Sequence, residues 1–196
     1  MSICRFILIS IILFLVCFGN IIVYAKDNTV VRTYIERKKY KEAIQLLKQK
    51  VKDAPEDKSS YALLGEVYGK QYKYDEALKW LKAGLKVNPE DSGIYFGLGW
   101  IYMNMARFDE AVKWLKDGLK TNPGDSELYL LLAKVYRIET NNDEALKWLN
   151  EGIGINPKNS GFYADLGRVY YRMGKNDEAV KWFKDGLKIN PDDSRM

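Results

Sequence analysis

Pairs of adjacent carboxylates are the groups in this 196-residue chain that could carry acid–base chemistry. Two neighbouring carboxyl groups can act as acid and base when their surroundings push their pKa values apart. The pairs return at a fixed interval of 34 residues, as Asp75-Glu76, Asp109-Glu110, Asp143-Glu144 and Asp177-Glu178. An active site needs only one such pair. Their recurrence therefore indicates acidic residues that stabilise the first turns of identical helices.

The remaining composition lacks the residue types of most catalytic centres. The chain has no histidine, and its two cysteines, Cys4 and Cys17, both precede residue 26. Zinc, haem and histidine-triad sites depend on these side chains. The glycines fall at repeat positions or turns, so no phosphate-binding loop is formed. We therefore expect a non-enzymatic protein without a cofactor or metal, which folds without disulfides.

A 34-residue repeat places the carboxylates. Its clearest copy spans residues 92–125, with further copies at 58–91, 126–159 and 160–193, and each copy contains Asn-Pro at its end. In residues 92–125, one apolar stripe at helical spacing comprises Tyr95, Leu98, Gly99 and Tyr102, and a second comprises Ala111, Leu115 and Gly118. The pattern predicts two helices per copy, stacked so that each copy contacts only its neighbours.

The repeat resembles the tetratricopeptide repeat (TPR). The signature of that family is an aromatic residue, Leu-Gly, Tyr, Ala, an aromatic residue or Leu, a small residue and Pro. Residues 92–125 match it with Tyr95, Leu98-Gly99, Tyr102, Ala111, Leu115, Gly118 and Pro123, and the other three copies match in register. The resemblance implies an all-α fold, a right-handed superhelical solenoid of antiparallel helix pairs with about five units.

Residues 26–57 resemble a degenerate first unit. Tyr34, Ala43, Leu47 and Pro55 keep the register, but Val30-Val31 replaces Leu-Gly. Terminal repeats are often atypical because one face meets water. A capping repeat and a flexible stalk are both compatible with this segment, and residues 194–196 are left as a tail.

Residues 1–25 have the pattern of a secretory signal peptide. One cation, Arg5, precedes an apolar run over residues 6–18, and Val23 and Ala25 are small residues placed for cleavage before Lys26. This arrangement predicts export to a periplasmic, extracytoplasmic or secreted location. Because the apolar run continues towards residue 23, an uncleaved segment that tethers the chain to a membrane is the alternative.

The resemblance also implies that the first helix of each pair lines the inner face of the solenoid. Residues at these positions differ between copies, whereas the packing residues do not, which suggests a separate task for that face. The predicted peptide-binding groove comprises Glu66, Phe96, Trp100, Met103, Asn104, Leu130, Lys134, Arg137, Arg168, Tyr171 and Arg172. It has an aromatic and methionine centre and a cationic end, residue types enriched in binding surfaces. Alternatively, Phe96 and Trp100 only fill gaps between repeats.

Some TPR domains hold a terminal carboxylate with a Lys and Asn clamp, and the matching positions here, Ala62, Glu66 and Gly97, lack those groups.

Four tryptophans occupy one position of the second helix, which favours a structural role: Trp80, Trp114, Trp148 and Trp182. The net charge is +5, and its lysines are interleaved with acidic residues. That pattern is more typical of a solvated face than of a nucleic-acid site.

Val180 and Leu187 of the last copy occupy positions that should meet a following unit. They predict either a frayed end or an end-on interface for self-association or a partner. The principal functional prediction is an exported, non-catalytic protein–protein interaction module that binds a peptide segment or protein in the groove. The alternative is a structural component of a cell-envelope complex that assembles through this end.

Overall fold

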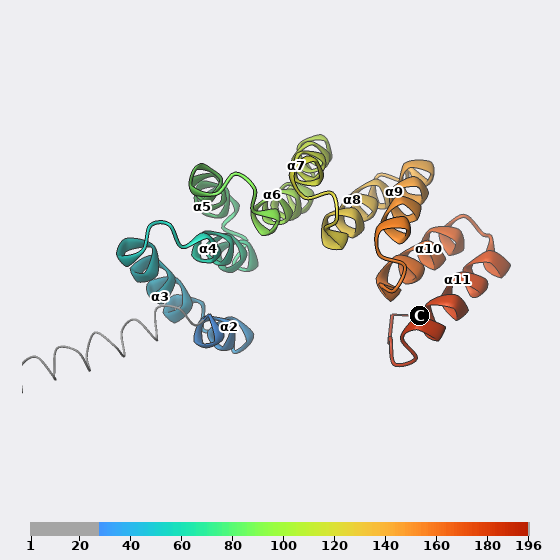
Figure 1. Ribbon diagram of the computed structural model, residues 1–196, viewed down its shortest axis with the longest axis horizontal. Helices are drawn as coiled ribbons and strands as arrows, with labels where there is room; N and C mark the ends of the chain where they lie inside the picture. The colour runs from blue at the N-terminus through green and yellow to red at the C-terminus, as the bar shows by residue number, and fades with distance from the viewer. Residues whose placement is uncertain (1–27, 196) are drawn as a thin grey trace, which may run out of the picture. The chain divides into compact units, whose positions relative to one another are not determined.

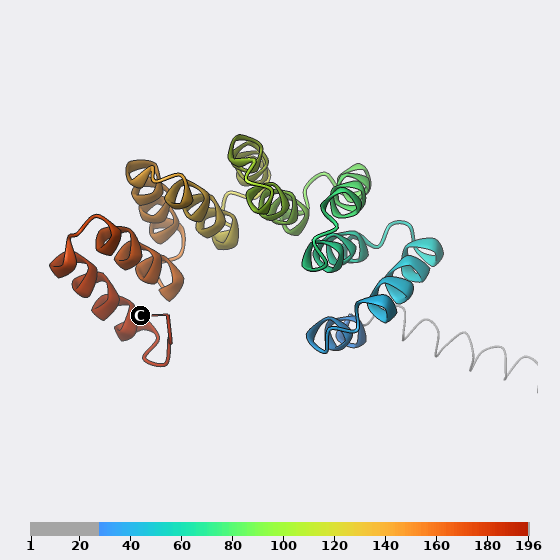
Figure 2. The same cartoon turned by 180° about the vertical axis from the view of Figure 1, so that it is seen from behind.

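The computed structural model describes residues 28–195, so the predictions for residues 1–25 lie outside the described part of the chain. The described residues form ten α-helices joined by short turns (Figures 1 and 2). Their bounds are Thr29–Glu36 (α2), Tyr40–Asp53 (α3), Lys58–Lys70 (α4), Tyr74–Val87 (α5), Ser92–Asn104 (α6), Phe108–Thr121 (α7), Ser126–Ile138 (α8), Asn142–Ile155 (α9), Ser160–Arg172 (α10) and Asn176–Ile189 (α11). The all-α architecture of sequential helix pairs is confirmed.

The chain divides into two compact units, with the boundary between Ser60 and Tyr61 inside α4. In the first unit α2 packs on α3 around the buried side chains of Val31, Ile35 and Leu47. The buried Lys50 donates a hydrogen bond to the side chain of Asn28 (2.5 Å) and lies 3.8 Å from the carboxylate of Asp57. The predicted degenerate repeat therefore contains a helix pair, and its role as a cap stays a prediction.

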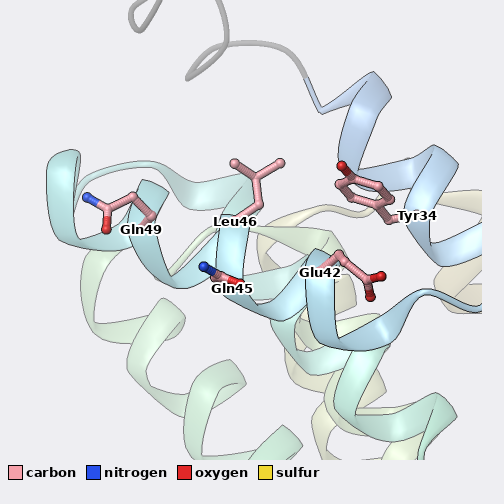
Figure 3. A pocket seen from close by; sticks show the side chains of 5 residues that line it. All are labelled: Tyr34, Glu42, Gln45, Leu46 and Gln49. Atoms are coloured by element: carbon pink, nitrogen blue, oxygen red, sulfur yellow. The ribbon is translucent and has the colours of Figure 1, made fainter.

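One side of this first pair carries a hollow between α2 and α3 (Figure 3). Glu42, Gln45, Leu46 and Gln49 line it from α3, and Tyr34 lines it from α2. Its lining contains a single charged side chain, so it offers no cluster of groups for chemistry.

In the second unit the helices pack as the pairs α6–α7, α8–α9 and α10–α11. The buried stripe predicted from the sequence forms the core, with Leu98 and Leu115 fully buried. Gly99 allows the two helices to cross closely, because a Cβ added there would lie 2.5 Å from the side chain of Leu115. Gly118 on the second helix also allows this close approach, because a Cβ added there would lie 2.6 Å from the Cβ atom of Tyr95. Contact distances this short explain why glycine recurs despite its cost inside a helix.

The turn between the two helices of each repeat uses the left-handed backbone region. Lys38, Tyr72, Ala106, Thr140 and Gly174 have φ values between 55° and 76° and are spaced 34 residues apart. A residue in this region ends a helix by satisfying its last carbonyl groups. Only the last of the five positions carries glycine, so four copies hold a side chain in a conformation that costs free energy.

The turn between repeats is held by the tyrosine that begins the signature. The hydroxyl of Tyr95 donates a hydrogen bond to the carbonyl of Pro89 at 2.8 Å. Tyr129 and Tyr163 make the same bond to the carbonyls of Pro123 (3.3 Å) and Pro157 (3.1 Å). Each of these tyrosines also contacts the tryptophan of its own repeat. The ring centroids are 6.3 Å apart for Tyr95–Trp114, 6.1 Å for Tyr129–Trp148 and 6.0 Å for Tyr163–Trp182. The tryptophans therefore cover the junction of each helix pair, as their period predicts.

Successive repeats meet through their first helices. Within the second unit α6 contacts α8, and α8 contacts α10, while each second helix contacts the first helix that follows it. The side chains of Trp100 and Ile101 on α6 lie against Gly69 of α4. These contacts join α4, α6, α8 and α10 into one continuous surface, which we call the first-helix face.

Candidate functional site

All residues of the predicted groove lie on helices of the first-helix face and within the second unit. The structure buries Met103, which is 8% exposed, and leaves Phe96, Trp100 and Leu130 half-buried. The exposed members are Glu66, Asn104, Lys134, Tyr171 and Arg172, and Arg137 and Arg168 are half-buried. The surface open to a ligand is therefore an apolar centre of three partly covered side chains with charged groups towards both ends.

The apolar centre also has a packing role. A Cβ added at Gly69 would lie 2.8 Å from a ring carbon of Trp100, so this ring fills part of the gap between two repeats. Met103 is covered by its surroundings and supplies packing rather than open contact area. The side-chain amide of Asn104 donates to the carbonyl of Trp100 at 2.7 Å, within its own helix. Gap filling thus accounts for part of this centre, and Phe96 and Trp100 keep part of their surface open.

The two ends of the face differ in charge. At the end formed by α4, Glu66 lies 3.5 Å from Lys70, so the negative charge there is partly neutralised. At the other end α8 and α10 carry Lys134, Arg137, Arg168 and Arg172. Lys134 is exposed and makes no hydrogen bond or ion pair within residues 28–195.

Two of the arginines at this end make hydrogen bonds, and one of them pairs with a carboxylate. Arg168 forms an ion pair with Asp165 at 2.6 Å and donates a second bond to the carbonyl oxygen of Arg195 at 3.1 Å. A guanidinium nitrogen of Arg172 donates to the carbonyl oxygen of Arg137. The Nε atom of Arg137 is buried and has no hydrogen-bond partner in the described chain. Burial lowers the pKa of Arg137, and the charges of Arg172 and Arg168 lower it further against the opposing effect of Asp165.

The segment after α11 returns to this face, a feature not predicted from the sequence. Ser160, at the start of α10, donates a hydrogen bond to Asp193 at 2.7 Å, and Arg195 donates to the same serine at 3.2 Å. The guanidinium of Arg195 lies beside Gly161, where an added Cβ would be 3.1 Å from its Nη1 atom and 3.3 Å from the side chain of Leu130. Figure 1 shows the chain turning back after α11 towards the start of α10. The segment therefore covers part of the predicted groove.

The position of Asp193 within the repeat could have predicted the turn of this segment from the sequence. Asp193 occupies the position of Asp91, Asp125 and Asn159, whose side chains accept hydrogen bonds from the first turn of the following helix. Asp193 accepts from the backbone amide of Arg195 at 3.1 Å in the same way. The side chain of Arg195, followed by that of Ser160, holds the pKa of the Asp193 carboxyl well below its usual range.

The recurring carboxylate pairs lie in the first turns of the second helices, where the helix dipole favours negative charge. Glu110 accepts a hydrogen bond from Arg107, which lowers its pKa. Within residues 28–195 no cluster of acidic or sulfur ligands is arranged to hold a metal ion. No helix in the same range combines the length and apolarity needed to cross a bilayer.

A family model described as tetratricopeptide repeat matches residues 34–92, 70–135 and 137–196. The fold is similar to several crystal structures that share less than a quarter of their residues with it. TTC0263, a TPR protein of Thermus thermophilus, has a TM-score of 0.71 at 22% identity, with 84% of this chain and 90% of that chain covered. PilW, described as a type IV pilus biogenesis factor, has a TM-score of 0.71 at 18% identity over 85% of this chain and 77% of PilW. YrrB, described as a TPR protein with an unusual peptide-binding site, has a TM-score of 0.59 at 18% identity, with 84% and 85% covered.

No curated protein sequence matches the chain. The structural matches establish similarity of fold, and the family model covers more than half of the chain. Members of this repeat family are non-catalytic scaffolds that bind protein or peptide partners, in agreement with the absence of catalytic groupings expected from the sequence. The chain belongs to the tetratricopeptide repeat family.

Proposed function

We propose that this protein is an exported interaction module that binds a segment of a partner protein along the first-helix face. One observation carries the proposal: half-buried aromatic and aliphatic side chains lie beside a cluster of basic groups on one continuous face. Aromatic residues and arginine supply most of the binding energy in protein interfaces. The second helices of residues 58–193, in contrast, share an Asp-Glu pair and a lysine four residues after its Asp: Lys79, Lys113, Lys147 and Lys181.

The bound segment would be apolar in its middle and acidic at one end. Phe96, Trp100 and Leu130 would contact its apolar part, and Lys134 and the three arginines would orient the acidic end. Charge complementarity of this kind mainly sets the rate of association and the orientation of the partner. Affinity should therefore fall as the salt concentration rises, because exposed charges are screened.

The export part of the proposal rests on the sequence of residues 1–25. The role of PilW in type IV pilus biogenesis is compatible with an envelope-associated module, and the peptide-binding site of YrrB is compatible with a binding module. The mass of the protein recovered from the source cells tests it. Loss of residues 1–25 would support cleavage, retention with membrane fractionation would support a tether, and an intact, cytosolic chain would contradict export.

Affinity capture from an envelope extract of the source cells tests the binding surface. The bait is residues 26–196, beside the same chain with Trp100→Ala or Lys134→Glu. Lys113→Glu on α7 is the control, since it makes the same charge change on an exposed second-helix position. A partner retained by the parent and the control but lost from the other two variants would support the proposal. Equal retention by all four would contradict it.

A second candidate function, assembly through the last repeat, is favoured by the exposure of α11. Val180 is 49% exposed and Leu187 is 37% exposed, whereas Leu119, the counterpart of Leu187 on α7, is 8% exposed. Unlike α11, α7 is followed within residues 28–195 by a helix that packs on it, α8. If this surface mediates assembly, Leu187→Glu should abolish it and leave binding on the first-helix face intact. Analytical ultracentrifugation over a range of concentrations decides, since a monomer mass that does not change with concentration contradicts self-association.

A further inference from the structure

The cationic end of the first-helix face carries more positive charge than its neighbours neutralise. Arg168 and Arg172 are close enough for their charges to act on Arg137, and Asp165 is the one carboxylate that shifts the pKa of Arg137. Three guanidinium groups and one carboxylate leave a formal excess of two positive charges. The nearby Arg195 and Asp193 pair with each other, and Glu127 also acts on Arg195. Four arginines and three carboxylates leave a formal excess of one positive charge, and the exposed Lys134 adds another.

The hydrogen bonds of the same groups are incompletely or weakly used. Beyond Asp165, the acceptors in contact with Arg168 and Arg172 are neutral backbone carbonyls, those of Arg195 and Arg137. The Nε donor of Arg137 has no acceptor at all among the described residues. A buried donor without an acceptor is unfavourable, and a guanidinium bonds to a carboxylate about twice as strongly as neutral groups bond each other. An anionic ligand with several oxygens would therefore improve the bonding of Arg168 and Arg172, and its negative charge would favour the half-buried guanidinium of Arg137.

The spacing of the arginines selects between kinds of anion. Arg168 and Arg172 are four residues apart on α10, so they are separated by about 6 Å along the helix axis. Two carboxylates two residues apart in an extended peptide point to the same side and lie about 6.5 Å from each other. In this structure the two guanidinium groups bond to different acceptors, Arg168 to Asp165 and the Arg195 carbonyl and Arg172 to the Arg137 carbonyl. Two separate carboxylates match this arrangement better than one phosphate does.

We propose that Arg137, Arg168 and Arg172 bind two carboxylates, on residues i and i+2 of an extended acidic segment, and that this segment displaces the carbonyl of Arg195 from Arg168. The proposal rests on the proposed function and specifies its acidic end. The segment around Asp193 then acts as a weak internal competitor, because it supplies a neutral acceptor where the ligand supplies a charged one.

Selection of a random 12-residue peptide library on the purified full chain tests the proposal while the natural partner is unidentified. Enrichment of peptides with Asp or Glu at i and i+2 is the expected result. Enrichment of peptides without this pair overturns the proposal but leaves the proposed function standing. If no peptide is enriched, the proposed function itself loses its support.

Affinities of one enriched peptide, measured by fluorescence anisotropy, then assign the residues. Moving one acidic residue to i+1 keeps the peptide charge but turns that side chain to the other side. We expect this shift, or the substitution Arg172→Gln, to weaken binding about ten-fold or more. Combining the two should add little, because both remove the same interaction. Lys113→Gln on α7 is the control and should change affinity less than two-fold. Equal affinity of the original and shifted peptides for the parent would overturn the proposal.

Two further variants make the test independent of a folding defect. Arg137→Gln should give the same loss as Arg172→Gln, with circular dichroism confirming that the helices persist. Asp193→Ala loosens the competing segment and should strengthen binding of the acidic peptide a few-fold. Unchanged affinity in Asp193→Ala would remove the competition from the proposal. Inorganic phosphate that displaces the peptide as well as a matched diacid does would show a general anion site instead.

Discussion

Substitutions of two tryptophans in neighbouring helices distinguish a binding role from a packing role. Trp100 on α6 lies on the first-helix face and contacts Gly69, while Trp114 on α7 contacts Tyr95 within its own repeat. Both are half-buried, so each substitution to alanine removes a similar apolar area. A fully buried Trp→Ala change costs about 3–5 kcal/mol, and for these partly covered rings we expect about 2 kcal/mol each. For a chain of this size that loss lowers the Tm by about 4–8 °C.

The binding measurement distinguishes the two variants. If Trp100 is a contact for the partner, Trp100→Ala should weaken binding by at least about 2 kcal/mol, or about 30-fold. Trp114→Ala should bind as the parent does once the folded fraction is taken into account. Thermal unfolding followed by circular dichroism and binding measured by isothermal titration calorimetry give the two quantities. Equal Tm losses with unchanged affinity in both variants would refute the assignment and leave Trp100 as a packing residue.

Three further predictions concern the frame that carries the face. Ala106 and Gly174 both have left-handed backbone conformations. Ala106→Gly should therefore raise the free energy of unfolding by about 0.5–1 kcal/mol, and Gly174→Ala should lower it by a similar amount. Changes of the opposite sign in urea unfolding would contradict the turn assignment. The side chain of Leu119 is covered, whereas that of Leu187 is partly exposed. Leu119→Ala should therefore lower the free energy of unfolding by about 2–3 kcal/mol and Leu187→Ala by about 1 kcal/mol. Equal losses in the same unfolding measurement would contradict this difference. The pKa of the Asp193 carboxyl is lower in the folded protein than its usual value in an unfolded chain, about 3.9. Its contribution to stability should therefore be complete above pH about 3.9 and be lost only as the pH falls towards the pKa of the folded state. Carboxyl chemical shifts of Asp193 that titrate near pH about 3.9 in the folded protein would contradict this.

Periodicity made most of the fold predictable. The residues that recur every 34 positions make the same contacts in each copy. The close approach of the two helices at Gly99 and Leu115 could therefore be inferred from the sequence. The tryptophan stripe was predicted as structural for the same reason and lies against tyrosines. Local rules suffice here because each repeat buries its core against its neighbours.

The candidate site was less predictable because its residues do not repeat. The first-helix positions could be assigned from the register, but the burial of Met103 depends on which side chains surround it in three dimensions. The contact of Arg195 with Ser160 joins residues 35 positions apart. The hydrogen bond of Arg168 to the Arg195 carbonyl likewise uses a backbone group, which carries no signal in the sequence.

Site-specific photo-crosslinking tests the central claim most directly. Phe96 is replaced by benzoylphenylalanine, which retains an aromatic ring at that position, and Lys113 on α7 is replaced in a second chain as the control. Both chains are produced in the source cells and irradiated, and the adducts are identified by mass spectrometry. Binding on the first-helix face predicts an adduct from position 96, mapping to an acidic, partly apolar segment of one partner, and none from position 113. Adducts from position 113 alone, or the same adducts from both positions, would contradict binding on that face.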